Sequence, residues 1–443
     1  MSAASAAAAP DRNVECVIGV DLGSTTSKAV VLDLEGRILG RGITNSRSSY
    51  DRAVEVARTE ALTAARFALL RREVEAKAGT AALKLLLDAF RLQQHLLQLL
   101  RLKALIDLEI PKLGPTAPGA KLGEAVAVIF DRVRGEEEAR YAATAKGEAP
   151  AGERSDFFRD AAGSAYTRLA EELAPTFGLD FDVLQGLFDK CIIAVENAPL
   201  ELGFVDHIDG ALHRVGDQPE LRAGVEAAVQ TKFVDRTTVG TGYGRARLPF
   251  PKEQIRSEIL CHGLGAHAMF PTTRTVLDIG GQDTKAIQVD AAGIVTSFQM
   301  NDRCAAGCGR YLGYIADEMN VGLHELGPLA EKSQKFVKIN STCTVFAGAE
   351  LRERLSLGEK REDILAGLHR AIMLRAMSLL ARSGGVVDAL TFTGGVAKNP
   401  AAVKALRALV TESYGARSIN ISPESIYTGA LGAAIFAQRL VRS

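Results

Sequence analysis

Two short loops combine aspartate, glycine, hydroxyl and lysine side chains, the groups that bind phosphates. The first is Asp21–Lys28 and the second, far downstream, is Asp278–Lys285. In each loop a glycine follows the first aspartate by two residues, a lysine by seven and a second aspartate by twelve. Glycines let the backbone approach a phosphate, hydroxyl groups solvate its oxygens and lysine neutralises its charge. The matched spacing predicts two related phosphate-binding loops.

A third glycine pair, Gly394-Gly395, follows the predicted strand Val386–Thr393. A lone glycine loop is typical of an ordinary hairpin turn, but three such sites together favour nucleotide binding. An aspartate at a strand end can hold Mg²⁺ through water or orient an attacking water, which makes Asp21 and Asp278 the candidate catalytic residues. The candidate cofactor-binding residues are Gly23, Ser24, Thr25, Thr26, Lys28, Gly280, Gly281, Gln282, Gly394 and Gly395.

The elements that must position these loops are short apolar strands. Glu15–Val20 and Ala29–Asp33 flank the first loop, and Arg274–Leu277 and Ala286–Asp290 flank the second. A strand, loop and strand that recur in one chain predict two similar subdomains, each aiming a polar loop at a shared cleft.

A different kind of sequence, rich in Ala, Leu, Glu and Arg, separates the two copies. In Ala82–Ile110 the polar residues recur at helical spacing, which predicts an amphipathic helix with a broad apolar face. These polar residues are Lys84, Asp88, Arg91, His95 and Gln98. We therefore predict core segments at 1–44 and 231–443 around a mostly helical insertion at 45–230. The insertion packs on its own domain, docks a partner subunit or lines a substrate route.

Two cysteines precede predicted helices. Cys304 stands before Gly309–Asn320 and Cys343 before Val345–Leu357. The partial positive charge of a helix N-terminus favours the thiolate form, which binds metals. Two thiolates cannot complete a four-cysteine iron–sulfur site, but a partner chain could supply the other two.

Five segments resemble the BadF/BadG/BcrA/BcrD ATPase family, whose members activate 2-hydroxyacyl-CoA dehydratases and drive benzoyl-CoA reductases. The segments are Gly19–Lys28, Ser257–Ala266, Asp278–Lys285, Asn301–Leu312 and Cys343–Ala349. The resemblance implies an α/β fold of two ribonuclease-H-like domains, as in the acetate kinase, sugar kinase, Hsp70 and actin superfamily. It also implies ATP, Mg²⁺ and a 4Fe–4S cluster shared between two subunits.

The same resemblance assigns Cys304 and Cys343 as the cluster ligands of this chain. Simple activators usually carry threonine where this chain has Cys308. We expect a buried thiol there, with a spare ligand or a hydrogen-bond donor to the cluster as alternatives. No functional residue is carried over within the insertion.

In chain length and in the amino-acid sequence of Asn301–Ser383, the protein resembles the larger ATPase subunits of class I benzoyl-CoA reductases. The expected function is ATP-driven transfer of electrons from reduced ferredoxin through the cluster to the subunits that dearomatise benzoyl-CoA. The implied partners are a homologous D-type ATPase subunit and B- and C-type subunits that bind the substrate. The alternatives are an activator of a 2-hydroxyacyl-CoA dehydratase, a small-molecule kinase and a chaperone-like ATPase.

The amino-acid composition argues against several other classes of protein. The 443 residues include 53 basic and 53 acidic side chains, so no broad basic field exists for nucleic acid. No uncharged apolar run reaches the length of a membrane span, and Met1–Pro10 lacks the features of a signal peptide. We therefore expect a cytoplasmic protein. Cys16, Cys191 and Cys261 are expected to be small buried hydrophobes.

Overall fold

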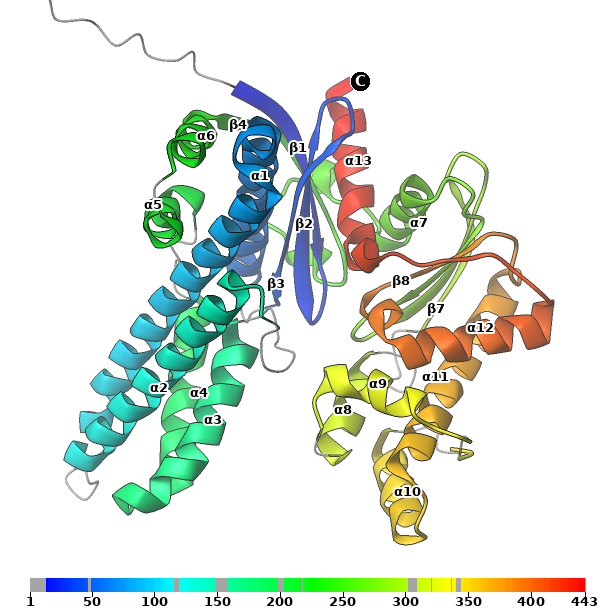
Figure 1. Ribbon diagram of the computed structural model, residues 1–443. Helices are drawn as coiled ribbons and strands as arrows, with labels where there is room; N and C mark the ends of the chain where they lie inside the picture. Colours follow the sequence, from blue (N-terminus) through cyan, green and yellow to red (C-terminus); the bar gives the residue numbers. More distant parts are fainter. Residues whose placement is uncertain are drawn as a thin grey trace, which may run out of the picture. The chain divides into compact units, whose positions relative to one another are not determined.

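The computed structural model describes residues 13–46, 49–114, 119–148, 158–197, 203–216, 218–301, 309–319, 321–335, 337–339 and 344–442. The chain divides into two compact units (Figure 1). We call Met1–Val14 with Arg47–Val234 the helical unit, and Glu15–Ser46 with Asp235–Ser443 the sheet unit. The predicted domain boundaries at residues 44 and 230 stay a prediction.

The helical unit is built around one long helix. Its elements are α1 (Tyr50–Glu109), η1 (Ile110–Leu113), α2 (Gly119–Ala145), α3 (Phe158–Phe177), α4 (Phe181–Asn197), α5 (Phe204–Val215) and α6 (Pro219–Gln230). Helix α1 is interrupted at Gly79, whose φ of 82° is not helical. Helices α5 and α6 pack on α1, as do α2 and α4, and α3 packs between α2 and α4.

Two apolar cores result from this arrangement. Leu86 and Phe90 of α1 are fully buried with residues of α5 and α6, while Leu102, Tyr166 and Phe188 belong to the core shared with α2, α3 and α4. The ring of Tyr166 stacks on that of Phe188 at 4.8 Å between centroids. Most of the apolar side chains in Ala82–Ile110 are therefore buried, although Leu100 and Leu108 are exposed.

The polar stripe of this helix differs from the prediction. Lys84 and Arg91 are exposed, but His95 and Gln98 are only 6% and 8% exposed. His95 Nε2 lies 4.0 Å from a carboxylate oxygen of Glu137 in α2, and its ring contacts Phe158. Because helices pack on α1 from more than one side, part of its polar face is covered as well.

The sheet unit contains two sheets. The first has the strand order β3-β2-β1-β4 and the second the order β7-β6-β5-β8-β9. The strands are β1 (Asn13–Leu22), β2 (Thr26–Asp33), β3 (Ile38–Asn45), β4 (Lys232–Thr241), β5 (Thr275–Ile279), β6 (Thr284–Val289), β7 (Val295–Asn301), β8 (Leu390–Thr393) and β9 (Ile419–Asn420).

The helices of this unit follow the strands. They are η2 (Arg245–Arg247), η3 (Lys252–Gln254), α7 (Glu258–Met269), α8 (Gly309–Met319), η4 (Leu323–Glu325), α9 (Leu326–Glu331), α10 (Thr344–Ser356), α11 (Arg361–Ser383), η5 (Gly395–Lys398), α12 (Pro400–Tyr414), η6 (Pro423–Tyr427) and α13 (Thr428–Arg442). Helices α8 and α10 begin within a residue of the predicted positions.

The internal repeat appears in the strand register. Strands β1, β2 and β3 form one antiparallel meander, and β5, β6 and β7 form another. In β1–β2 Asp21 lies opposite Lys28, and in β5–β6 Asp278 lies opposite Lys285. The matched spacing in the sequence therefore corresponds to two hairpins with the same cross-strand pair.

Helices α7 and α13 cross at glycines. A Cβ at Gly265 would collide with the carbonyl oxygen of Thr428, and one at Gly432 with that of Cys261. Gly19 of β1 likewise leaves room for the backbone of α13. This close packing brings the first residues of both helices to the ends of the strands that carry the aspartates.

Helix α11 lies in the core beside the second sheet. It has the length and apolar composition of a membrane span, but 61% of its apolar window is buried in the protein. Its His369 is 1% exposed, with Nδ1 donating to the Leu365 carbonyl oxygen at 2.7 Å and Nε2 accepting from Asn399 at 3.0 Å. Burial lowers the pKa of His369 to about 4.

Candidate functional site

The two predicted phosphate loops touch each other within the sheet unit. The space beside the Gly281 Cα is occupied by the Thr25 side chain, 2.6 Å from where a Cβ would stand. The amide nitrogen of Gln282, in the orientation that satisfies its hydrogen bonds, donates to Ser24 Oγ at 3.3 Å. Predicted members of the two loops thus meet at their tips, although they are far apart in the sequence.

Hydrogen bonds from Ser46, at the end of the first meander, also hold the first loop in place. Ser46 Oγ donates to the Gly23 carbonyl oxygen at 2.6 Å, and the Ser46 N–H donates to the Thr25 carbonyl oxygen at 2.7 Å. Thr26 is already the first residue of β2. The loop between the strands is therefore short, which keeps its backbone groups close to Asp21.

Both aspartates are buried and paired. Asp21 is 4% exposed and Asp278 is 1% exposed. Lys28 Nζ lies 3.5 Å from Asp21 Oδ2, and Lys285 Nζ lies 3.4 Å from Asp278 Oδ2. Each hairpin therefore carries a carboxylate and an ammonium group side by side, and Lys28 points at its own aspartate.

Asp278 has two further neighbours. Thr393 Oγ1 donates to Asp278 Oδ1 at 2.8 Å, and His262 Nδ1 lies 3.2 Å from the same oxygen. Burial alone would raise the pKa of Asp278, but the charges of His262 and Lys285 hold it far below its usual value. Asp283 lies 2.8 Å from Lys285, and the two aspartates raise the pKa of that lysine against its burial. Asp278 is therefore a stable carboxylate.

The third glycine pair joins the second loop through the sheet. Thr393 of β8 lies opposite Asp278 in the parallel β5–β8 pairing. Gly394 has a φ of 86°, and a Cβ there would collide with the Ile279 carbonyl oxygen. Open space surrounds the Cα of Gly395. Gly394 thus lets the backbone after β8 pack closely against the end of β5.

Several residues at the site were missed by the sequence analysis. Gly242, with a φ of 102°, packs against Asp21 Oδ1. A Cβ at Gly429 would lie 2.7 Å from His262 Nε2 and 2.9 Å from Asp21 Oδ2. Glu258, in the first turn of α7, is 5% exposed and burial raises its pKa. The glycine-rich run after β4 was a signal that could have pointed to Gly242; the others depend on helix packing.

Helix α8 starts directly on the second loop. The Gly309 N–H donates to the Gly280 carbonyl oxygen, and the Arg310 N–H donates to that of Gly281, both at 2.8 Å. Arg310 Nη1 also donates to the amide oxygen of Gln282 at 2.8 Å. The helix that follows the predicted metal-binding cysteine Cys304 in the sequence is therefore tied to the phosphate loop.

Cys304, Cys308 and Cys343 lie outside the described residues. The helices that follow them, α8 and α10, contact each other where Gly348 faces Tyr314 Oη and where Arg352 pairs with Glu318. The other three cysteines, Cys16, Cys191 and Cys261, are buried, as expected. In the described part of the chain, no three potential metal-ligating side chains are placed to hold an ion.

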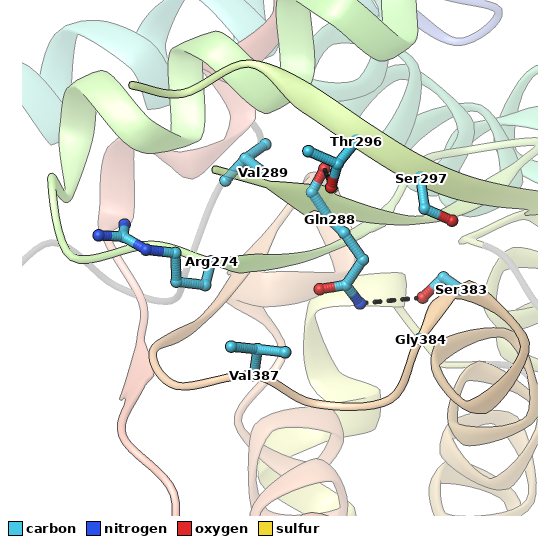
Figure 2. A pocket seen from close by; sticks show the side chains of 8 residues that line it. All are labelled: Arg274, Gln288, Val289, Thr296, Ser297, Ser383, Gly384 and Val387. Atoms are coloured by element: carbon cyan, nitrogen blue, oxygen red, sulfur yellow. Dashed lines mark hydrogen bonds between the residues drawn. The ribbon is translucent and has the colours of Figure 1, made fainter. Parts of the chain in front are cut away.

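A cavity of about 320 Å³ lies at the other ends of the strands of the second sheet (Figure 2). Gln288 is its central polar side chain. The Gln288 amide donates to Ser383 Oγ at 3.2 Å and to the Gly385 carbonyl oxygen at 2.8 Å, and it accepts from Thr275 Oγ1 at 3.0 Å. None of the predicted site residues lines this cavity, so it plays no part in the site formed by the loops.

Comparison with known proteins identifies relatives of the chain. The family model of the BadF/BadG/BcrA/BcrD ATPases matches residues 18–437. The (R)-2-hydroxyglutaryl-CoA dehydratase activating ATPase of Acidaminococcus fermentans is 45% identical over 202 residues, which are 46% of this chain and 75% of that protein. The activator of lactoyl-CoA dehydratase of Anaerotignum propionicum is 43% identical over 222 residues, 50% and 83% of the two chains.

A solved structure agrees with these matches. The crystal structure of the A. fermentans (R)-2-hydroxyglutaryl-CoA dehydratase component A aligns with a TM-score of 0.50 and 25% identity, covering 97% of this chain and 99% of that chain. The predicted fold, an α/β protein of the acetate kinase, sugar kinase, Hsp70 and actin superfamily, is confirmed.

The main predicted function, a component of benzoyl-CoA reductase, is wrong. The D-type component of the benzoyl-CoA reductase of Thauera aromatica is 31% identical over 211 residues, 48% of this chain and 74% of that protein. The dehydratase activators are clearly more similar, at 43% and 45%. The prediction relied on chain length and on the sequence of Asn301–Ser383, and the added length forms a separate helical unit.

Proposed function

Because the chain belongs to the BadF/BadG/BcrA/BcrD ATPase family, we propose that it is the ATP-hydrolysing activator of a 2-hydroxyacyl-CoA dehydratase. The observation that carries this proposal is the meeting of two aspartate loops in a chain that is 45% identical to a dehydratase activating ATPase. The dehydratase is then the partner enzyme, and a 2-hydroxyacyl-CoA is the partner's substrate.

The loops fit the phosphates and Mg²⁺ of ATP. Mg²⁺ keeps several waters and is usually bound by one or two carboxylates together with phosphate oxygens. Asp21 and Asp278 supply two carboxylates, and the described residues offer no complete protein cage. Asp278 stays ionised because Lys285 and His262 flank it, so it can accept a hydrogen bond from a metal-bound or attacking water. Bound Mg²⁺ would neutralise charge on the phosphates.

The lysines complete the charge balance. Lys28 Nζ lies 3.5 Å from Asp21 Oδ2, and the lysine side chain is 12% exposed. The ammonium group is therefore next to the loop and paired with the Asp21 carboxylate. When a phosphate enters, the same ammonium group can donate to a phosphate oxygen. Gly394 and Gly395, at the end of β8, leave space for the adenosine beside the second loop.

An iron–sulfur cluster belongs to the same proposal. We infer that Cys304 and Cys343 supply two ligands of a 4Fe–4S cluster and that a second ATPase subunit supplies two more. Support comes from the helices after these cysteines, since α8 and α10 pack against each other. Such a cluster would accept a low-potential electron from reduced ferredoxin and pass it to the dehydratase. The proposal does not include the B- and C-type partners, because they belong to benzoyl-CoA reductase. Cytoplasmic localisation stays a prediction.

The test uses the full chain purified without oxygen. With MgATP we expect release of ADP and inorganic phosphate, and dehydration of (R)-2-hydroxyglutaryl-CoA or lactoyl-CoA when a dehydratase component is added. Cys304→Ser and Cys343→Ser should lose bound iron and the cluster absorbance but keep MgATP binding. Cys308→Ser is the matched control and should keep its iron.

Three outcomes would contradict the proposal. Transfer of the phosphoryl group to an added hydroxyl or carboxylate compound, in place of water, would indicate a kinase. Full iron content in both Cys304→Ser and Cys343→Ser would remove the ligand assignment. Failure to support any dehydratase, in a protein that hydrolyses ATP and holds iron, would remove the activator role.

A further inference from the structure

Arg310 is a cation at the junction of the two phosphate loops. It is exposed and lies in the first turn of α8, whose first two N–H groups donate to the carbonyl oxygens of Gly280 and Gly281. Nη1 and Nη2 of Arg310 lie 2.8 and 3.3 Å from the amide oxygen of Gln282, and the Gln282 nitrogen contacts Ser24 Oγ. The guanidinium group therefore bonds directly to the second loop and is linked to the first loop through Gln282.

Arg310 differs from the two lysines of the site in the charge of the group that it contacts. Lys28 is paired with Asp21, and Lys285 is paired with Asp278 and Asp283. In the part of the chain that the structure describes, the side-chain contact of Arg310 is a neutral amide and not a carboxylate. Among the described residues, no carboxylate therefore pairs with Arg310, whereas carboxylates pair with both lysines.

A guanidinium group binds a phosphate through two parallel N–H donors, and the negative charge of the phosphate adds an attraction that the neutral amide of Gln282 lacks. An anion that enters between the loop tips will therefore compete well with Gln282 for Arg310. The exchange costs little because Arg310 is exposed.

We propose that Arg310 binds the terminal phosphate of ATP and is thereby the residue that distinguishes ATP from ADP at this site. This inference rests on the proposed ATPase function. ADP has no terminal phosphate at this place, so Arg310 returns to Gln282 after hydrolysis and phosphate release. Because α8 is tied to Gly280 and Gly281 by its backbone, a movement of the second loop carries the start of the helix with it.

The first test is nucleotide binding by calorimetry, with Mg²⁺ and either ADP or the non-hydrolysable analogue AMP-PNP. Arg310→Gln should weaken AMP-PNP binding by about tenfold to a hundredfold, the contribution of a hydrogen bond to a charged group, and leave ADP binding unchanged. Arg310→Lys keeps the positive charge but lacks the planar guanidinium group. Its affinity for AMP-PNP should lie between those of the wild type and Arg310→Gln. Arg274→Gln is the matched control, because Arg274 lines the cavity at the other end of the same sheet.

The second test is hydrogen exchange of the peptide Gly309–Met319 in the full chain. In the wild type, AMP-PNP should protect this peptide more than ADP does, and Arg310→Gln should remove the difference. An equal loss of ADP and AMP-PNP binding in Arg310→Gln would mean that the side chain only links the loops, and would overturn the inference. Unchanged discrimination would overturn it too. A wild-type chain that binds neither nucleotide would instead refute the proposed function.

Discussion

Replacing Asp278 with asparagine removes the charge that Lys285 and His262 share while it keeps an oxygen acceptor for Thr393 Oγ1. Lys285 is 3% exposed, so its ammonium group cannot be solvated by water. Removing one partner of a buried ion pair costs about 3–5 kcal/mol. Since Asp283 remains 2.8 Å from Lys285, we expect Asp278→Asn to lower the free energy of unfolding by about 3 kcal/mol, the low end of this range.

Asp278→Asn should also slow ATP hydrolysis by at least about a hundredfold, the usual cost of losing a group that positions water or a proton. Nucleotide binding should be less affected, because the glycine loops remain. Thr393→Val is the matched control for stability. It removes the hydroxyl donor but leaves the charge of Asp278, so we expect a loss of about 1 kcal/mol.

Two measurements decide this prediction. Urea unfolding followed by hydrogen exchange in β5 and β6 reports the stability of the sheet unit by itself, and single-turnover hydrolysis is measured where every variant is folded. The reasoning fails if Asp278→Asn is no less stable than Thr393→Val, since the buried charge of Asp278 would then make no contribution to the free energy of unfolding. Near-normal hydrolysis by Asp278→Asn would remove the proposed catalytic role.

The remaining predictions concern packing and pH. Gly432→Ala should cost about 3 kcal/mol or more because its Cβ meets backbone, whereas Gly313→Ala, with open space around it in α8, should stabilise the chain by about 1 kcal/mol; urea midpoints compare them. Leu86→Asp should destabilise the helical unit by about 4 kcal/mol or more yet leave ATP hydrolysis unchanged, and loss of both would contradict the two-unit division. For His369, whose pKa falls from 6.5 to about 4 on folding, the unfolded chain binds a proton that the folded chain rejects, so stability should drop by about 3 kcal/mol between pH 6.5 and 4. His369→Gln, which cannot titrate, should lose that share of the pH dependence in unfolding titrations.

The helical unit shows how far sequence periodicity reaches. It predicted the amphipathic helix at Ala82–Ile110 with a broad apolar face, to which the buried Leu86 and Phe90 belong, because a helix of fixed pitch places every third or fourth residue on one face. It did not predict that His95 and Gln98 would be buried. Their burial depends on a second set of helices that covers the same helix, and no local pattern records that neighbour.

The functional site divides in the same way. The sequence by itself determined the two aspartate loops, because Asp21 and Lys28, like Asp278 and Lys285, face each other across a hairpin, and a hairpin register is a local property. Only the tertiary structure decided that Glu258, His262 and Arg310 join these loops. They come from helices α7 and α8, and their place depends on glycine contacts and backbone hydrogen bonds between segments far apart in the chain, which residue spacing does not encode.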